Sequence, residues 1–68
     1  MITWKPQTKW YIENQQRLAV VGNNGYRCYK KVALWYAVRL VAGRYDDLGA
    51  FDKLADAKAA CERDWERP

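Results

Sequence analysis

Residues 34–65, LWYAVRLVAGRYDDLGAFDKLADAKAACERDW, decide the fold. The apolar run over 34–41 ends at Ala42-Gly43, where glycine permits a tight turn, and residues 44–51 then return as a second strand. Beyond this strand, apolar residues recur at helical spacing, at Leu54, Ala57, Cys61 and Trp65. The stretch therefore predicts a β-hairpin that leads directly into one amphipathic helix over 52–66. Asp52 is expected to cap that helix, because its carboxylate can accept hydrogen bonds from the first-turn amides.

Upstream of this stretch, the residues 17–21 and 26–32 predict a second hairpin. Between them lies GNNG, and glycine and asparagine readily adopt the positive φ angles of hairpin turns. Residues 10–14, WYIEN, predict either a further strand or an extended arm. Residues 1–9 have little periodicity, so we expect a loosely held arm with Trp4 as its anchor.

These elements predict an α+β fold for a single domain over residues 1–68. The predicted sheet occupies residues 10–51 and has three or four antiparallel strands. The C-terminal helix packs on one of its faces. Within 34–41 the more apolar alternate set is Leu34, Tyr36, Val38 and Leu40, so we expect this set to face the helix and Trp35 and Arg39 to lie on the opposite face.

The composition favours binding over catalysis. The chain has four Trp, five Tyr and a net charge of +4, and its basic residues concentrate before residue 45, where Glu13 is the one carboxylate. A basic surface of this kind favours a polyanionic partner. The sequence contains neither His nor Ser, which rules out a Ser-His-Asp triad and leaves the cysteines without an imidazole to activate them. We therefore expect no enzymatic activity, no cofactor, no metal and no small-molecule substrate.

The sequence also indicates where the protein resides. It has no apolar run near the roughly 20 residues of a membrane span, and its first residues lack the apolar core of a signal peptide. We therefore expect a cytoplasmic protein without membrane contact, in the bacterial host cytoplasm if a phage encodes it. In that compartment Cys28 and Cys61 are expected to be buried thiols in preference to a disulfide.

Basic and aromatic residues interleave in the middle of the chain. Lys and Arg can neutralise phosphates, while Tyr and Trp can stack on bases. The candidate contact residues for a nucleic acid or another partner are Arg27, Tyr29, Lys30, Lys31, Trp35, Arg39 and Arg44. The alternative is that Tyr29 and Trp35 pack against the N-terminal arm and that the charges are ordinary surface.

Residues 25–61 carry two resemblances. The aromatic-X-Ala step at Trp35-Tyr36-Ala37, the strand end at 48–51 and the helix opening resemble the plant AP2/ERF-type DNA-binding domain and the β3α arm-binding domains of phage integrases. This resemblance implies that a three-stranded sheet reads the DNA major groove. The pattern Leu-Gly-X-Phe-X-X-Leu-X-X-Ala-Lys-X-X-Cys over 48–61 more closely resembles the C-terminal part of small uncharacterised phage and prophage proteins, which implies no particular activity.

Two functions follow as expectations. The first is a nucleic-acid-binding module, for DNA or RNA, that uses a basic, aromatic face of the sheet. The second is a small phage-type protein that binds and modulates a host protein, for which an exposed aromatic surface beside an acidic helix would serve.

Overall fold

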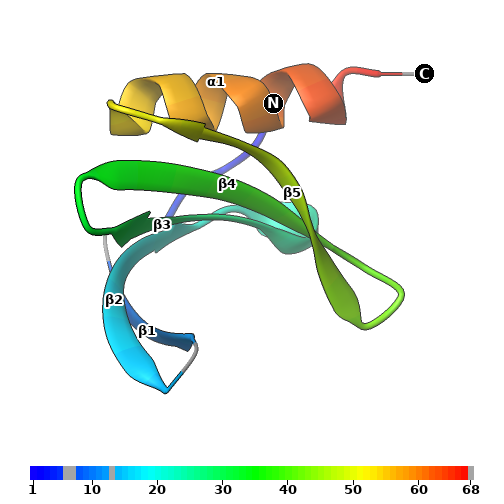
Figure 1. The fold of residues 1–68 in the computed structure, drawn as a ribbon. Helices are drawn as coiled ribbons and strands as arrows, with labels where there is room; N and C mark the ends of the chain where they lie inside the picture. The colour runs from blue at the N-terminus through cyan, green and yellow to red at the C-terminus, as the bar shows by residue number, and fades with distance from the viewer. Residues whose placement is uncertain (6–7, 13, 68) are drawn as a thin grey trace.

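The computed structural model describes residues 1–5, 8–12 and 14–67, and it contains one antiparallel sheet and one helix. In chain order the elements are β1 (Thr8–Ile12), β2 (Gln15–Val21), β3 (Tyr26–Lys31), β4 (Leu34–Val41), β5 (Arg44–Phe51) and α1 (Leu54–Trp65). The strands lie in the order β1-β2-β3-β4-β5, and α1 covers one face of the sheet (Figure 1). The predicted α+β fold is confirmed. The sheet has five strands and not the predicted three or four, because the residues around Trp10 pair with β2 and do not form an arm.

The first residues are held more closely than predicted. Ile2 is 3% exposed and belongs to the core, and Trp4 forms a β-bridge with Gly22. The Lys5 amide donates a hydrogen bond of 2.8 Å to the Val21 carbonyl. A side chain at Gly22 would meet Ile2 Cγ2 at 2.6 Å, so glycine allows this segment to lie against the sheet. Pro6 and Gln7, also assigned to the predicted arm, lie outside the described residues.

The two predicted turns are confirmed, and a third has no sequence signal. A short 3-10 turn at Asn23–Gly25 joins β2 to β3, with φ of 59° at Asn24. Ala42 and Gly43 join β4 to β5 with φ of 52° and 82°. Between β3 and β4 the chain turns at Val32, whose φ is 59° although valine is β-branched and disfavours this region.

Replacing Val32 with Asn is expected to raise the free energy of unfolding by about 0.5–1 kcal/mol. Asparagine tolerates positive φ, whereas a Cβ-branched residue is strained there, and Val32 is exposed, so no packing is lost. The change is measured as the shift in the urea midpoint. As the control in the opposite direction, Gly43→Ala should lower stability by about 1 kcal/mol. A destabilised Val32→Asn variant would contradict the strained turn.

The helix packs on the face opposite to the one predicted. Trp35 and Ala37 point toward α1, whereas Tyr36 and Val38 lie on the other face in a second hydrophobic cluster. The reason is size. Ala37 is paired with Cys28 on β3 and with Gly49 on β5, so a strip of small residues crosses three strands. The small residues of the helix, Ala57, Ala60 and Cys61, can approach this strip closely, and all three are buried.

The ends of α1 also differ from the prediction. The helix covers Leu54–Trp65 and not 52–66, and its N-cap is Lys53, which makes no side-chain capping hydrogen bond. Asp52 therefore lies one residue too early to cap the first turn. At the other end, the Asp64 carboxylate accepts hydrogen bonds from Tyr26 Oη at 2.7 Å and from Arg39 Nη1 at 3.2 Å, which joins the end of the helix to β3 and β4.

The two cysteines meet between β3 and α1. Cys28 and Cys61 are free thiols, both fully buried, with their sulfur atoms 3.9 Å apart. The prediction of buried thiols is thus confirmed, and the structure adds that they are neighbours. The hydrogen bond to Cys61 and burial both raise the pKa of Cys28, so this thiol stays protonated and unreactive at neutral pH.

Candidate functional site

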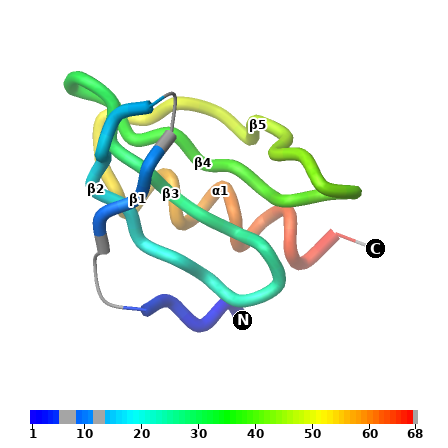
Figure 2. The backbone as a smooth tube through the Cα atoms, turned by 90° about the horizontal axis from the view of Figure 1, so that it is seen from below, coloured from blue at the N-terminus to red at the C-terminus, as the bar shows by residue number. Residues whose placement is uncertain are grey.

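The face of the sheet away from α1 is concave. The β1–β2 hairpin and the β4–β5 hairpin both bend away from the helix, toward the same side (Figure 1), and Figure 2 shows this side from below. The ring of Trp10 on β1 contacts the ring of Tyr45 on β5, with centroids 5.3 Å apart at 72°. Side chains of the two outermost strands therefore meet across this face, which we call the concave face.

An aromatic cluster forms the base of the concave face. Tyr29, on the central strand β3, contacts Trp10 with ring centroids at 5.8 Å and Tyr36 at 5.4 Å, both nearly edge-on. Tyr29 is 7% exposed, and Ala19 and Val38 are buried beside it. Edge-to-face pairs of this kind contribute more to stability than the burial of their surface area alone. The concave face thus has its own small hydrophobic core, which keeps its shape without cover from the helix.

Two arginines lie within this aromatic surface. The guanidinium carbon of Arg27 is 4.8 Å from the centroid of Trp10 and 5.9 Å from that of Tyr45, which are cation–π distances. Arg17 is paired with Trp10 across β1 and β2. The Nε atoms of both arginines are buried and have no hydrogen-bond partner within the described residues. The guanidinium of Arg27 therefore lies against two aromatic rings, and Arg17 follows beside it on the neighbouring strand.

Beside the cluster lies a hollow of about 420 Å³. Tyr29 and Tyr36 line it from the sheet interior, and small residues of β5 leave space at its edge. Its lining residues are Tyr29, Lys31, Tyr36, Asp47, Gly49 and Ala50. The volume falls within the range of small-ligand sites, and the lining combines aromatic rings with one basic and one acidic group.

The structure divides the predicted contact residues between different surfaces. Arg27, Tyr29 and Lys31 lie on the concave face, as their alternation along β3 requires. Lys30 is exposed on the other side of β3. Arg44 is exposed at the β4–β5 hairpin, with its Nε atom 3.6 Å from Asp46 Oδ1.

Two predicted contact residues lie on the face covered by the helix. Trp35 is 9% exposed in the core beneath α1, and Arg39 is paired with Asp64 of the helix. The expectation that Trp35 and Arg39 lie opposite the helix was therefore wrong, because the small residues of β4 and not its larger apolar set receive the helix.

Sequence reasoning missed the part of the site contributed by the strands other than β3. These residues are Trp10, Arg17, Tyr36, Tyr45 and Asp47. One sequence signal could have found part of this set. If residues 10–14 form a strand, Trp10 lies beside the residues of β2. The approach of β1 to β5 depends on sheet curvature, for which the sequence offers no local pattern.

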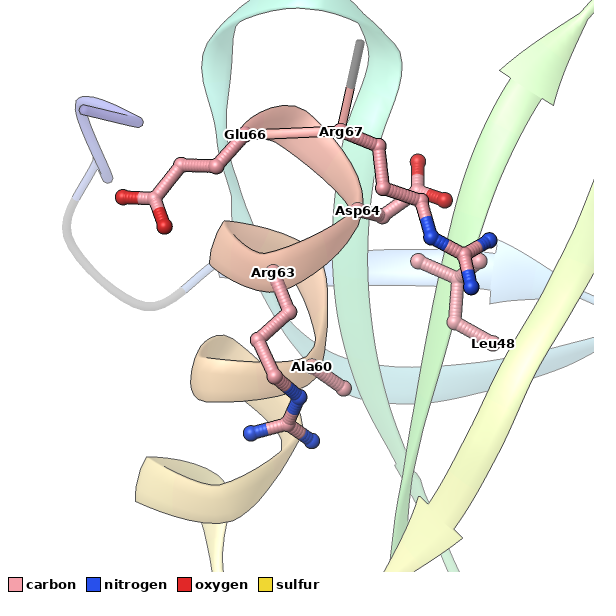
Figure 3. A pocket seen from close by; sticks show the side chains of 6 residues that line it. All are labelled: Leu48, Ala60, Arg63, Asp64, Glu66 and Arg67. Atoms are coloured by element: carbon pink, nitrogen blue, oxygen red, sulfur yellow. The ribbon is translucent and has the colours of Figure 1, made fainter.

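A second hollow, of about 520 Å³, lies at the C-terminal end of α1. It is lined by Leu48, Ala60, Arg63, Asp64, Glu66 and Arg67. In Figure 3 the guanidinium groups of Arg63 and Arg67 point in different directions, and the Glu66 side chain extends to the far side of the helix. Asp64 already accepts hydrogen bonds from Tyr26 and Arg39. Because these polar groups do not converge, the concave face is the better candidate site.

The described part of the chain contains no cluster of three or more His, Cys, Asp or Glu side chains able to hold a metal ion. Within the same residues, no helix is both long and apolar enough to cross a membrane. No protein family, curated protein or solved structure matches this chain.

Proposed function

We propose that the chain binds nucleic acid, without catalysing a reaction, through its concave face. The supporting observation is that Arg17, Arg27 and Lys31 share this face with the rings of Tyr36 and Tyr45. Cationic side chains neutralise phosphates, and aromatic rings stack on bases, which together are the means by which proteins hold an extended strand.

The distribution of charge determines which face of the molecule turns toward a polyanion. The concave face carries basic groups from β2 and β3, whereas carboxylates outnumber Lys and Arg from residue 45 onward, where α1 lies. The positive face attracts the phosphate backbone more strongly than α1 does, because the three carboxylates and two basic residues of α1 nearly balance. Binding through the concave face therefore leaves α1 pointing away from the nucleic acid.

Binding to a host protein is the second candidate, and one observation favours it. Leu40, Val41 and Tyr45 at the end of the β4–β5 hairpin are 41%, 36% and 38% exposed. Neighbouring exposed apolar side chains at a hairpin end are suited to contact with a protein surface. We prefer the nucleic-acid proposal because it also accounts for the positive charges of the concave face.

Lys31→Gln is expected to reduce the salt dependence of nucleic-acid binding. If Lys31 neutralises one phosphate, its loss lowers the slope of log K against log salt by about 0.7 for a single strand. Lys30→Gln is the matched control, because Lys30 is the adjacent residue but lies on the opposite side of β3. Labelled oligonucleotides titrated at several salt concentrations measure both slopes.

Two results would contradict the proposal. If neither single-stranded nor duplex DNA or RNA binds at low salt, nucleic-acid binding is refuted and the host-protein candidate is favoured. If Lys30→Gln lowers the slope as much as Lys31→Gln, binding does not occur through the concave face.

A further inference from the structure

We propose that the hollow beside Tyr36 receives one unpaired base bearing an exocyclic amino group, so that the chain selects single strands and prefers cytosine over uracil. This inference rests on the proposed function and specifies its ligand. It is carried by the curvature of the face, by the space between Tyr36 and β5, and by the position of Asp47.

Curvature decides between duplex and single strand. A major groove about 12 Å wide admits a convex element, such as a helix or a two-stranded ribbon. The concave face presents the reverse shape, because Trp10 and Tyr45 approach to 5.3 Å across it. The sheet therefore does not present a convex element to the major groove. Because the bases of a duplex are paired and stacked, the unpaired base of a single strand is the one that can turn into the hollow.

The hollow has a ring on which a base can stack. Tyr29 is only 7% exposed, so its neighbour Tyr36, which is half-buried, offers the accessible aromatic surface. Tyr36 is paired directly with Ala50 on β5. Because Ala50 and the adjacent Gly49 carry no large side chain, the space beside the tyrosine ring stays open. A base placed there stacks on Tyr36 and lies over the edge of the sheet.

Asp47 supplies the selectivity. It lines the same hollow and is exposed, so its carboxylate is accessible to a ligand. An ionised carboxylate only accepts hydrogen bonds, so it matches the amino group of cytosine and opposes the carbonyl oxygen that uracil has at the same ring position. Lys31, on the same hollow, is placed to neutralise the phosphate of that nucleotide.

The experiment compares oligo-dC with oligo-dU of equal length. Cytosine carries an amino group beside an unprotonated ring nitrogen, whereas uracil carries a carbonyl oxygen beside a ring N–H. Fluorescence anisotropy at mildly alkaline pH is expected to show about tenfold tighter binding of oligo-dC, the size of one charge-assisted hydrogen bond. A duplex of the same length should bind more weakly than oligo-dC.

Two isosteric variants test the assignment to Asp47. Asp47→Asn is expected to bring the dC to dU ratio close to one, because the amide can donate as well as accept. Asp46→Asn is the matched control and should keep the ratio, because Asp46 is paired with Arg39 on the opposite side of β5. A charge on an edge strand also discourages strand pairing, but that structural role would not change base preference.

Equal affinity for oligo-dC and oligo-dU, or tighter binding of the duplex, would overturn this inference while leaving nucleic-acid binding in place. Retention of the dC preference by Asp47→Asn would also overturn it. No binding of any oligonucleotide at low salt would overturn the inference and the proposed function together. The two failures are therefore distinguishable in one set of titrations.

Discussion

Replacing Trp35 with Ala is expected to lower the free energy of unfolding by about 3–5 kcal/mol. Trp35 is 9% exposed in the core between the sheet and α1, where it is paired with Phe51 on β5. A domain of this size has a total stability on the order of 3–10 kcal/mol, so the loss removes much of it. Urea denaturation followed by circular dichroism measures the effect, and part of the variant is expected to be unfolded without denaturant.

Trp65→Ala is the matched control for this experiment. Trp65 is 38% exposed at the end of α1, and its ring packs edge-to-face against that of Tyr26 with centroids 6.2 Å apart. Its removal should cost about 1 kcal/mol. If Trp35→Ala were no more destabilising than Trp65→Ala, Trp35 would not be part of the core beneath the helix.

Raising the pH from about 10 to about 12 is expected to lower the free energy of unfolding by about 2 kcal/mol through Tyr26 alone. Burial, the hydrogen bond donated to Asp64 and the charge of that carboxylate raise the pKa of Tyr26 to about 12. Cys61 acts in the same direction, and Arg39 opposes it.

The sign follows from the two ionisation states. In the unfolded chain, tyrosine loses its proton near pH 10, whereas the folded protein holds the Tyr26 proton until about pH 12. The unfolded state therefore binds fewer protons between these values, and stability falls as the pH rises through them. Below pH 10 both states are protonated, and the stabilisation from this group is fully present.

Tyr26→Phe isolates this effect, because it keeps the ring and removes the ionising hydroxyl. Urea midpoints of the wild type and the variant, measured at a series of pH values, give the difference due to Tyr26, since the remaining tyrosines, lysines and thiols titrate in both proteins. The difference should narrow as the pH rises from 10 to 12. An equally steep alkaline loss in Tyr26→Phe would contradict the role of Tyr26.

Local patterns in the sequence predict most of the elements. The GNNG segment and Ala42-Gly43 indicate two hairpins, and the spacing of Leu54, Ala57 and Cys61 indicates the helix, because turn chemistry and helical period act over a few residues. The turn at Val32 escapes such reasoning, since its positive φ is imposed by the pairing of β3 with β4 against the preference of valine.

The candidate site was only partly predictable for a related reason. Alternation along β3 correctly groups Arg27, Tyr29 and Lys31, because residues two apart share a face whatever the fold. Alternation alone does not determine which alternate residues of β4 lie on the same face as these three. The prediction therefore placed Trp35 and Arg39 on the wrong face. Trp10 and Tyr45 are 35 positions apart in the chain, and only the curvature of the sheet brings them together.

The sequence by itself thus determines the order of the elements, the basic character of the first half and the interleaving of cations with aromatic rings. The tertiary structure decides which face the helix covers, because Cys28, Ala37 and Gly49 form a strip of small residues only once three strands are in register. It also decides the concave face, because strand twist and closure are collective properties of the whole sheet.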